Sequence, residues 1–491
     1  MKLETIMQTL SKEEAALQFG YQNVDPLTGA FPHKRVVHAG LTGRPVKADQ
    51  TQGVWEKIMF SVPEQMAPRS VYIHIPFCQT RCLYCNFFQN AANQAIEDKY
   101  IDCLIQEIEA SAAVPQMKDG LIHAVFIGGG TPTSLSPQNA KRLLQTIHDC
   151  LPLANDYELT LEGRIYDLVP EKMDIWMKHG VNRMSLGVQS FHTHIRRQLG
   201  RIDDQETVLK RLAELKAYQQ CAVIVDLIYG LPDQDMKLWK EDLELLSASA
   251  VDGMDLYQLN VFEESEMNKR IQAGKMSPAA DTARQAEMFS FAHDFLTKRA
   301  FKRLSICHWT RNNRERSLYN ILAKEGRDMF PFGCGAGGSI GGYTTMLHRM
   351  LPVYEKLVKE EKKPCMVLME QSPLQPIINT VLGQLEQGFL DLQRLIQAEP
   401  RLSELQWLYK LWEERGLVKY NGILYELTLA GQFWQVNLSQ TTVECIQILV
   451  TGEKSLAVQK IAAQDGAMKL HPKIQHMPEG HPAIGAGFAK A

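Results

Sequence analysis

Three cysteines lie within eight residues of one another, in a segment that reads Val71-Tyr-Ile-His-Ile-Pro-Phe-Cys78-Gln-Thr-Arg-Cys82-Leu-Tyr-Cys85. The other seven of the ten cysteines are scattered along the chain, and small buried side chains are the simpler interpretation for them. A structural zinc site usually has four nitrogen or sulfur ligands, and no second CxxC pair lies nearby to complete one. Three thiolates would instead suit three irons of a [4Fe–4S] cluster and leave the fourth iron open.

The elements around this cluster predict an α/β fold. Residues 71–75 form a short apolar run that ends at Pro76, so the cysteines are expected in the loop after a strand. Further apolar, strand-like runs alternate with amphipathic segments of helical length, such as 97–113 and 207–217. This pattern indicates a parallel sheet, and a partial (β/α) barrel fits it. Because barrel enzymes carry their chemistry at the C-terminal strand ends, the motifs should share one rim.

Two of these strand ends carry residues that could bind a small molecule. Gly128-Gly-Gly-Thr-Pro-Thr133 follows a strand-like run, and its glycines would let a ligand approach the backbone closely. An ordinary strand-to-helix turn explains the same residues equally well. Glu162 ends another apolar strand, where a carboxylate is costly unless it is paired with a cation such as an amino group or an arginine.

Together these motifs resemble the radical S-adenosylmethionine (SAM) superfamily, and specifically its coproporphyrinogen dehydrogenase-like branch. The resemblance spans roughly residues 69–437, and it includes the cysteine spacing, the preceding YIHIPFC, GGGTPT, and GVNRMSLGVQSF at 180–191. It implies that Cys78, Cys82 and Cys85 hold a [4Fe–4S] cluster whose open iron binds SAM. The C-terminal helix and hairpin around 405–429 are similar to the winged-helix-like domain of the same branch.

The resemblance also implies a SAM site. In the family, the glycine-rich segment binds the methionine amine, Gln189 and Asp226 match ribose contacts, and Arg201 matches an arginine that binds a SAM carboxylate through a charge-assisted fork. The family can bind two SAM molecules, and the matching positions would divide between them. These positions are Tyr72, Tyr84, Gly129, Gly130, Thr131, Glu162, Gln189, Arg201, Asp226 and Asn260.

Three departures distinguish this chain within the branch. Coproporphyrinogen dehydrogenases have a further cysteine two residues after the third ligand, where this chain has Phe87. Haem chaperones share the phenylalanine, but they begin almost directly at the cluster strand. They also carry a Tyr–Glu–Ser–Asn string that is absent here, where residues 304–309 read LSICHW and residues 330–338 read FPFGCGAGG. A haem chaperone and an oxygen-independent coproporphyrinogen decarboxylase remain the alternatives.

These features are most similar to the anaerobic haem-degrading radical SAM methyltransferases, the anaerobilin synthases. That resemblance implies haem as substrate, opening of the macrocycle at a meso carbon, addition of a methyl group and release of iron, which gives a linear tetrapyrrole. One SAM would be cleaved reductively to a 5′-deoxyadenosyl radical. We hypothesise that this radical acts on the methyl group of a second SAM. Reduced flavodoxin or a flavin donor is the expected electron source.

Histidines are the candidates for an axial haem ligand, because imidazole is a common one. His308, beside Cys307, is the first candidate, although a polar residue near a barrel end is an equally good interpretation. His33 and His38 in the N-terminal part are further candidates. The tail histidines His471, His476 and His481 are expected to be solvated.

Length and composition define the remaining expectations. A chain of 491 residues should have one large domain and smaller ones. We expect an N-terminal extension that could act as a lid (1–68), the radical SAM partial barrel (69–372), a winged-helix-like domain (373–450) and a mobile tail (451–491). A net charge of -3 and the lack of a basic stripe disfavour nucleic acid as a partner. No apolar run approaches the roughly 20 residues of a membrane span, and the N-terminus lacks a signal core, so a cytoplasmic monomer is expected.

Overall fold

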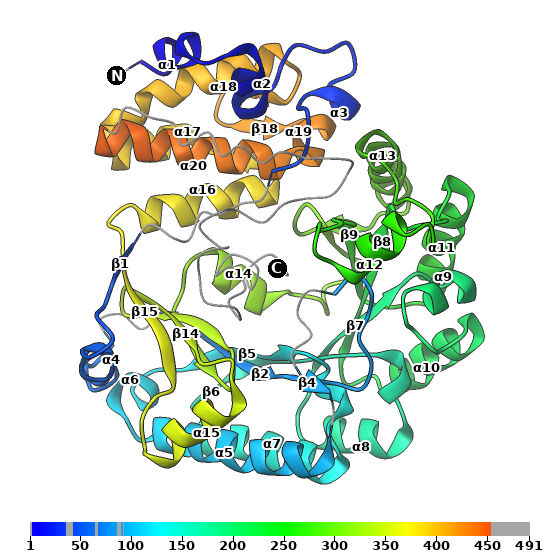
Figure 1. The fold of residues 1–491 in the computed structure, drawn as a ribbon, viewed down its shortest axis with the longest axis vertical. Coiled ribbons are helices and arrows are strands. Elements are labelled where there is room, and N and C mark those ends of the chain that lie inside the picture. Colours follow the sequence, from blue (N-terminus) through cyan, green and yellow to red (C-terminus); the bar gives the residue numbers. More distant parts are fainter. Residues whose placement is uncertain (1, 36–42, 64–66, 86–89, 92, 453–491) are drawn as a thin grey trace.

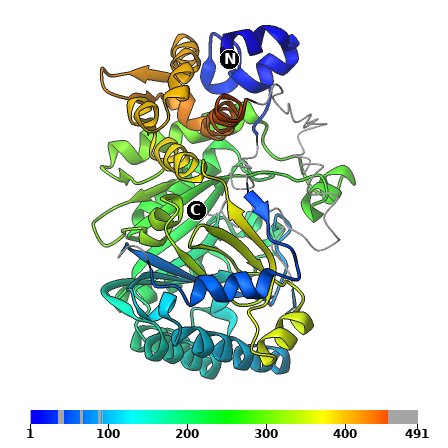
Figure 2. The same cartoon turned by 90° about the vertical axis from the view of Figure 1, so that its left-hand side faces the viewer.

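The computed structural model describes residues 2–35, 43–63, 67–85, 90–91 and 93–452. A large α/β unit lies below a smaller, mainly helical one (Figures 1 and 2). Within these residues, no helix combines the length and the apolar character that a membrane crossing requires. The predicted mobile tail, 451–491, lies outside the described residues except for its first two positions, where the last helix ends.

The large unit is built on one twisted sheet, which has 13 strands among the described residues. Seven of them, from β12 to β9, run parallel to one another, and the flanking strands on both sides are antiparallel. The predicted α/β partial barrel is therefore confirmed. The strand order is β1 (Gly43–Pro45), β15 (Cys365–Gln371), β14 (Tyr343–Leu347), β13 (Gly337–Ile340), β12 (Met329–Phe332), β2 (Arg69–Ile75), β5 (Ile122–Gly129), β6 (Leu153–Gly163), β7 (Arg183–Gln189), β8 (Ala222–Tyr229), β9 (Gly253–Gln258), β11 (His308–Thr310) and β10 (Lys302–Arg303).

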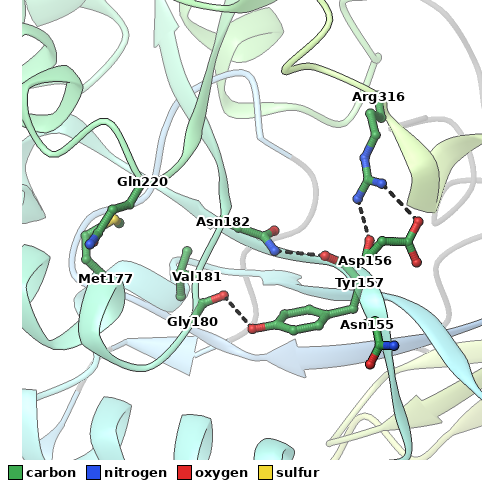
Figure 3. A pocket seen from close by; sticks show the side chains of 9 residues that line it. All are labelled: Asn155, Asp156, Tyr157, Met177, Gly180, Val181, Asn182, Gln220 and Arg316. Carbon is green, nitrogen blue, oxygen red and sulfur yellow. Dashed lines mark hydrogen bonds and ion pairs between the residues drawn. The ribbon is translucent and has the colours of Figure 1, made fainter.

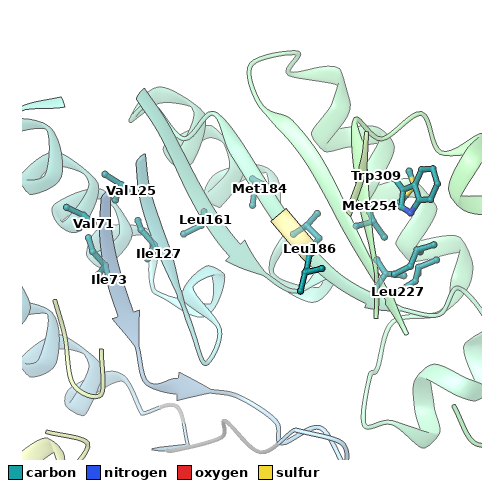
Figure 4. Packing of buried hydrophobic residues seen from close by; sticks show 14 of the residues in the cluster. Val71, Ile73, Val125, Ile127, Leu161, Met184, Leu186, Leu227, Met254 and Trp309 are labelled. Carbon is teal, nitrogen blue, oxygen red and sulfur yellow. The ribbon is translucent and has the colours of Figure 1, made fainter. Parts of the chain in front are cut away.

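The parallel strands are apolar because both of their faces are covered. Side chains such as Val71, Ile73, Val125 and Ile127 are buried in the main hydrophobic core (Figure 4). The intervening residues, Tyr72 among them, point to the other face, because side chains alternate along a strand. Polar residues can therefore line the barrel interior while the outer face packs against helices.

Helices follow the parallel strands and cover the outside of the barrel (Figure 1). Many begin at a residue whose side chain caps the first turn, as Ser136 does for α7 and Asp235 for α11. The helices of this unit are α4 (Thr51–Met59), α5 (Gln94–Ala112), α6 (Pro115–Lys118), α7 (Pro137–Cys150), α8 (Pro170–Lys178), α9 (Thr193–Gln198), α10 (Gln205–Ala217), α11 (Met236–Ala248), α12 (Glu266–Gln272), α13 (Thr282–Lys298), α14 (Leu318–Lys324) and α15 (Leu351–Lys359), with short turns η1 (Pro132–Ser134) and η2 (Ile165–Asp167).

The smaller unit contains the predicted C-terminal domain. Its helix α18 is followed directly by the β17–β18 hairpin, as expected for a winged-helix-like arrangement. A third short strand, β16, completes the small sheet. The elements are α16 (Gln375–Gln387), β16 (Phe389–Leu390), α17 (Leu392–Ala398), η3 (Pro400–Glu404), α18 (Leu405–Glu414), β17 (Val418–Tyr420), β18 (Tyr425–Leu427), α19 (Leu429–Phe433) and α20 (Gln435–Thr451).

The described residues of the N-terminal extension, which could act as a lid, pack in two places. Helices α1 (Leu3–Thr9) and α2 (Lys12–Phe19) pack on α18 and α20, and α3 (Pro26–Gly29) packs on α13 and α19 (Figure 1). Residues 43–45 add strand β1 to the edge of the large sheet. Residues 2–35 are therefore part of the C-terminal unit, and the described remainder belongs to the barrel.

Candidate functional site

The three clustered cysteines lie at the C-terminal end of β2. Strand β3 (Phe77–Cys78) pairs with β4 (Asn90–Ala91), and this pairing fixes the first cysteine. Cys78 and Cys82 are buried and Cys85 is half-buried. The Cys85 amide donates to the Cys82 carbonyl (3.1 Å), and the Thr131 hydroxyl donates to Cys78 Sγ (3.4 Å). The loop is therefore tied both to itself and to the glycine-rich turn after β5.

Neighbouring groups also change the pKa of the first cysteine thiol. Burial raises the pKa of the Cys78 thiol, while the Thr131 hydroxyl and the Arg164 guanidinium lower that pKa. In the described part of the chain, no three metal-binding side chains converge on a point that could hold a single ion. A [4Fe–4S] cluster does not require convergence, because each thiolate binds a different iron. Three grouped thiols beside an arginine therefore fit a cluster better than a mononuclear metal.

The glycine-rich turn is packed directly on the cluster strand. The Gly130 amide donates to the Ile75 carbonyl (2.7 Å), and a Cβ at Gly130 would collide with the Phe77 carbonyl. Gly129 has a φ of 113°, a conformation that favours glycine. Its amide donates to the Glu162 carboxylate (3.2 Å) from the end of β6. Glycine is thus required here for backbone packing, and the turn brings Glu162 next to the cluster loop.

Gln189 and Arg201 form a polar corner beside the same loop. Arg201 donates from Nη1 to the Gly187 carbonyl (3.0 Å) and from Nη2 to Tyr84 Oη (2.8 Å). Burial alone would lower the pKa of the Arg201 guanidinium, but Tyr84 and the nearby Cys82 raise that pKa above its ordinary value. Arg201 Nε and Gln189 Oε1 are both buried and have no hydrogen-bond partner among the described residues.

These two orphaned atoms allow a test of whether the site fits SAM. SAM carries a carboxylate, which needs a cationic donor, and ribose hydroxyls, which need an acceptor. Arg201 Nε is a buried charged donor and Gln189 Oε1 is a buried acceptor. The residues that the resemblance implied for the carboxylate and the ribose therefore have the hydrogen-bonding capacity that SAM would use.

The other predicted SAM residues occupy the barrel interior and its rim. Tyr72 Oη is hydrogen-bonded to His74 Nδ1 (2.9 Å), and the ring stacks near Phe126. Asp226 accepts a hydrogen bond from the Ser185 hydroxyl (3.2 Å) on the neighbouring strand β7. Asn260, which we matched by spacing alone, is exposed in the segment after β9.

His308, the first candidate for a haem ligand, has both ring nitrogens engaged. Nδ1 lies 2.9 Å from Asp255 Oδ1, and Nε2 lies 3.1 Å from Glu315 Oε1. Glu315 in turn accepts from the buried Arg183 (3.0 Å). An axial-ligand role would require one of these buried ion pairs to break, so the geometry favours the structural interpretation of His308. The adjacent Cys307 lies 3.8 Å from Asp255 and has its pKa raised by burial.

Of the other histidine candidates for haem binding, the structure describes only His33. His33 is half-buried on the C-terminal unit, where its carbonyl accepts from Asn437 Nδ2 (3.0 Å). Burial and the neighbouring Arg35 lower the pKa of the His33 imidazole. His38 and the tail histidines lie outside the described residues, as does Phe87.

Arg164 is a site residue that the sequence did not reveal. It follows Glu162 by two positions, and its Nη1 donates to the Thr80 carbonyl (3.0 Å) and hydroxyl (2.8 Å) within the cluster loop. Its amide donates to the Thr133 hydroxyl (3.1 Å). Arg164 therefore links the cluster loop to the end of the glycine-rich segment. The sequence feature that could have indicated Arg164 is its position, as a charged residue directly after the end of a buried strand.

A polar hollow of about 420 Å³ lies at the opposite end of the barrel strands. It is lined by residues at the N-terminal ends of β6, β7 and β8, including Tyr157, Asn182 and Gln220 (Figure 3). Arg316 pairs with Asp156 across it, so its charged groups satisfy one another. Because the cysteine loop is at the C-terminal ends, this hollow is not the candidate active site.

Comparison with known proteins agrees with this geometry. The model of the radical SAM superfamily matches residues 72–246. Anaerobilin synthase from Escherichia coli O157:H7 is 36% identical over 420 residues, which cover 85% of this chain and 93% of that protein. The chain belongs to the radical SAM superfamily. Membership implies a [4Fe–4S] cluster and SAM as its cofactors.

One further relative supports the coproporphyrinogen dehydrogenase-like branch for this radical SAM chain, and one solved structure shares its fold. Heme chaperone HemW from Bacillus subtilis (strain 168) is 30% identical over 297 residues, or 60% of this chain and 77% of that protein. The solved structure of coproporphyrinogen III oxidase (HemN) from Escherichia coli superposes with a TM-score of 0.67 at 21% identity, covering 76% of this chain and 90% of that one. The latter similarity concerns the fold.

Proposed function

We propose that this radical SAM protein opens the haem macrocycle anaerobically, transfers a methyl group and releases iron, as a methyltransferase of the anaerobilin synthase type. The observation that carries the proposal is the match to anaerobilin synthase over 93% of that relative's length. The heme chaperone match covers less of this chain, 60% against 85%. The similarity to anaerobilin synthase therefore extends over parts of the chain beyond the shared barrel.

The chain's own residues would bind and orient two SAM molecules. Cys78, Cys82 and Cys85 would hold the cluster, Gly129, Gly130 and Thr131 would cradle the methionine part, and Arg201 would bind a carboxylate. When bound, the cluster and SAM would supply a 5′-deoxyadenosyl radical, and a second SAM would supply the methyl group. Tyr72, Tyr84, Glu162, Gln189, Asp226 and Asn260 complete the proposed SAM contacts.

Exclusion of water is the second task of these residues. Radical chemistry requires a closed site, because solvent and oxygen quench reactive species. Cys78, Cys82, Gln189 and Arg201 are all buried. We also propose reduced flavodoxin or a flavin as the electron donor, haem as substrate, and a monomer acting in the cytoplasm, where the reducing poise would preserve free thiols. Cys307, His308, His33 and His38 are the proposed candidates for haem binding, and binding by His308 would require one of its two ion pairs to break.

Product analysis tests this function. The reconstituted protein is incubated without oxygen with haem, SAM and a chemical reductant, and the products are separated by mass spectrometry. We expect loss of haem, an iron-free linear tetrapyrrole and 5′-deoxyadenosine. A parallel incubation with coproporphyrinogen in place of haem is the control for a decarboxylase.

Each of the two alternative functions predicts a different result. A haem chaperone would retain bound haem unchanged, and a decarboxylase would shorten the propionate side chains of coproporphyrinogen without methyl transfer. Unchanged haem together with abundant 5′-deoxyadenosine would contradict the ring-opening function.

A further inference from the structure

Arg196 is a fully buried arginine in α9 to which the sequence assigned no role. The residue has an exposure of 0% among the described residues. Burial and the neighbouring Arg201 lower the pKa of its guanidinium to about 10. A buried cation is costly unless its donors are satisfied, and a second cation nearby adds to that cost. The contacts of Arg196 should therefore show which groups stabilise the buried guanidinium and which part of the structure it holds in place.

The guanidinium binds the carbonyl groups of the two residues that flank Gln189. Nη1 donates to the Val188 carbonyl (2.6 Å) and to the Ser190 carbonyl (3.3 Å). Gln189 itself has a φ of 71°, in the left-handed region that disfavours residues other than glycine. The register between β7 and β8 also shifts at this point. Arg196 thus holds the backbone on both sides of a strained residue.

The strained conformation decides where the Gln189 side chain points. Its Oε1 is buried and has no partner in the part of the chain that the structure describes, and its amide nitrogen and Arg201 Nη2 both lie beside Gly187. A left-handed residue persists only where its surroundings determine it. If the flanking carbonyls were released, Gln189 could relax to an extended conformation, which would turn its side chain away from Arg201.

The same guanidinium also fixes the segment that carries Arg201. Nε donates to the Asp203 carbonyl (2.8 Å), and Nη2 lies 3.6 Å from the Asp203 carboxylate. The Arg201 amide donates to the Arg196 carbonyl (2.9 Å). Both halves of the polar corner, Gln189 and Arg201, are therefore positioned relative to Arg196.

Asp242 from α11 holds the turn from its other side. Its carboxylate accepts from the Ser190 hydroxyl (2.9 Å) and the Phe191 amide (2.6 Å). These bonds involve residues after Gln189 and do not reach Val188 or Asp203. Arg196 thus connects the end of β7 with the Arg201 segment, in addition to the hydrogen bond from Arg201 itself to the Gly187 carbonyl.

We propose that Arg196 is a positioning residue that presents Gln189 and Arg201 to SAM by holding the carbonyls of Val188, Ser190 and Asp203. The proposal rests on the SAM site of the proposed function. It assigns Arg196 no contact with SAM.

The test is SAM affinity in the absence of haem, measured by equilibrium dialysis on anaerobically reconstituted protein. Arg196→Gln should weaken SAM binding about tenfold or more, because several charge-assisted hydrogen bonds are lost. Iron–sulfur absorbance should be retained. Arg183→Gln is the matched control. Arg183 is also a buried arginine, but it is the first residue of β7, at the end of the strand opposite Gln189, and it pairs with Glu315. It should lower Tm and leave SAM affinity within about threefold.

A double-mutant cycle with Gln189→Ala separates positioning from general stability. If Arg196 acts largely through Gln189, Arg196→Gln should weaken binding at least about threefold less in the Gln189→Ala background than in the wild type. Should Arg196→Gln fail to fold, Arg196→Lys keeps the charge but cannot reach all three carbonyls, and it enters the same cycle. Unchanged SAM affinity in the Arg196 variants would overturn the proposal. A fold-change in the double mutant equal to the product of the two single-mutant fold-changes would also overturn it. The wild-type affinity tests the SAM site itself, whereas the ratio between variants tests Arg196.

Discussion

Cys82 has an exposure of 2%, and its carbonyl is bonded to the Cys85 amide within the loop. The loop is held on one side by Arg164 through Thr80 and on the other by Leu199, whose carbonyl accepts from the Leu83 amide (3.3 Å). These contacts do not involve the Cys82 thiol. Removing that thiol should therefore change cluster binding more than it changes the fold of the loop.

Cys82→Ala should abolish assembly of the [4Fe–4S] cluster, because one of three thiolate ligands is lost. Iron content and visible absorbance after anaerobic reconstitution measure this. Cys221→Ala is the matched control, because Cys221 has an exposure of 3% but lies just before the start of β8, away from the loop. This variant should retain both signals. Full iron content and activity in Cys82→Ala would refute the assignment of the ligands.

His308 should make protein stability depend on pH. Burial alone would lower its pKa, but Asp255 and Glu315 raise it to about 9. A pKa raised by folding means that the folded protein binds the proton more tightly than the unfolded chain. The stabilisation is therefore complete below about pH 6.5 and is lost as pH rises through about 9.

We expect the unfolding free energy of the wild type to fall by about 3 kcal/mol between about pH 7 and pH 10, because the stabilisation by protonated His308 is lost. The unfolding free energy of His308→Gln should fall far less over the same range. Urea denaturation at both pH values measures the difference. His148→Gln, at an exposed position, should behave like the wild type. Equal pH dependence in wild type and His308→Gln would contradict the buried ion pairs.

The site residues differ in how far their roles could be predicted from the sequence. The cysteines, the glycine-rich turn and Gln189 lie in contiguous strings, so their types and spacing were informative. Arg196 was invisible because it binds backbone carbonyls, which every residue has. His308 was misleading, since the carboxylate that engages Nδ1 comes from Asp255, 53 residues earlier in the chain.

At the scale of elements, the N-terminal helices complete the C-terminal unit. Phe19, at the end of α2, has an exposure of 0% and meets Trp407 edge-on. Its carbonyl accepts from Trp412 Nε1 (3.0 Å). Arg35 forms an ion pair with Glu444 of α20 (2.6 Å). Apolar runs predicted the strands and helices themselves, but no local pattern could show that residues 2–35 pack on helices some 400 positions away.

Phe19→Ala should destabilise the C-terminal unit by about 3–5 kcal/mol, the usual cost of removing a buried phenylalanine. The tryptophans of α18 report its unfolding, so fluorescence during thermal or urea denaturation measures the effect. Tyr21→Ala, at a position that is 39% exposed, should change stability little. A fluorescence transition that is unchanged in Phe19→Ala would show that the N-terminal helices do not support this unit.

For the whole molecule, the barrel brings the cluster loop, the glycine-rich turn and the Gln189–Arg201 corner to one rim. The C-terminal position of all three follows from the parallel direction of β2, β5 and β7. The fold class could therefore be predicted from alternating strands and helices. The choice among reactions on this rim depends on how the substrate is held as well as on local features such as Phe87.

Transfer of carbon from SAM to haem tests the central claim most directly. The protein is incubated anaerobically with haem, a reductant and SAM that carries a ¹³C-labelled methyl group, with Cys82→Ala as the inactive control. We predict an iron-free linear tetrapyrrole that carries the label, and no such product from Cys82→Ala. Intact haem, or an opened product without the label, would contradict a haem-opening methyltransferase.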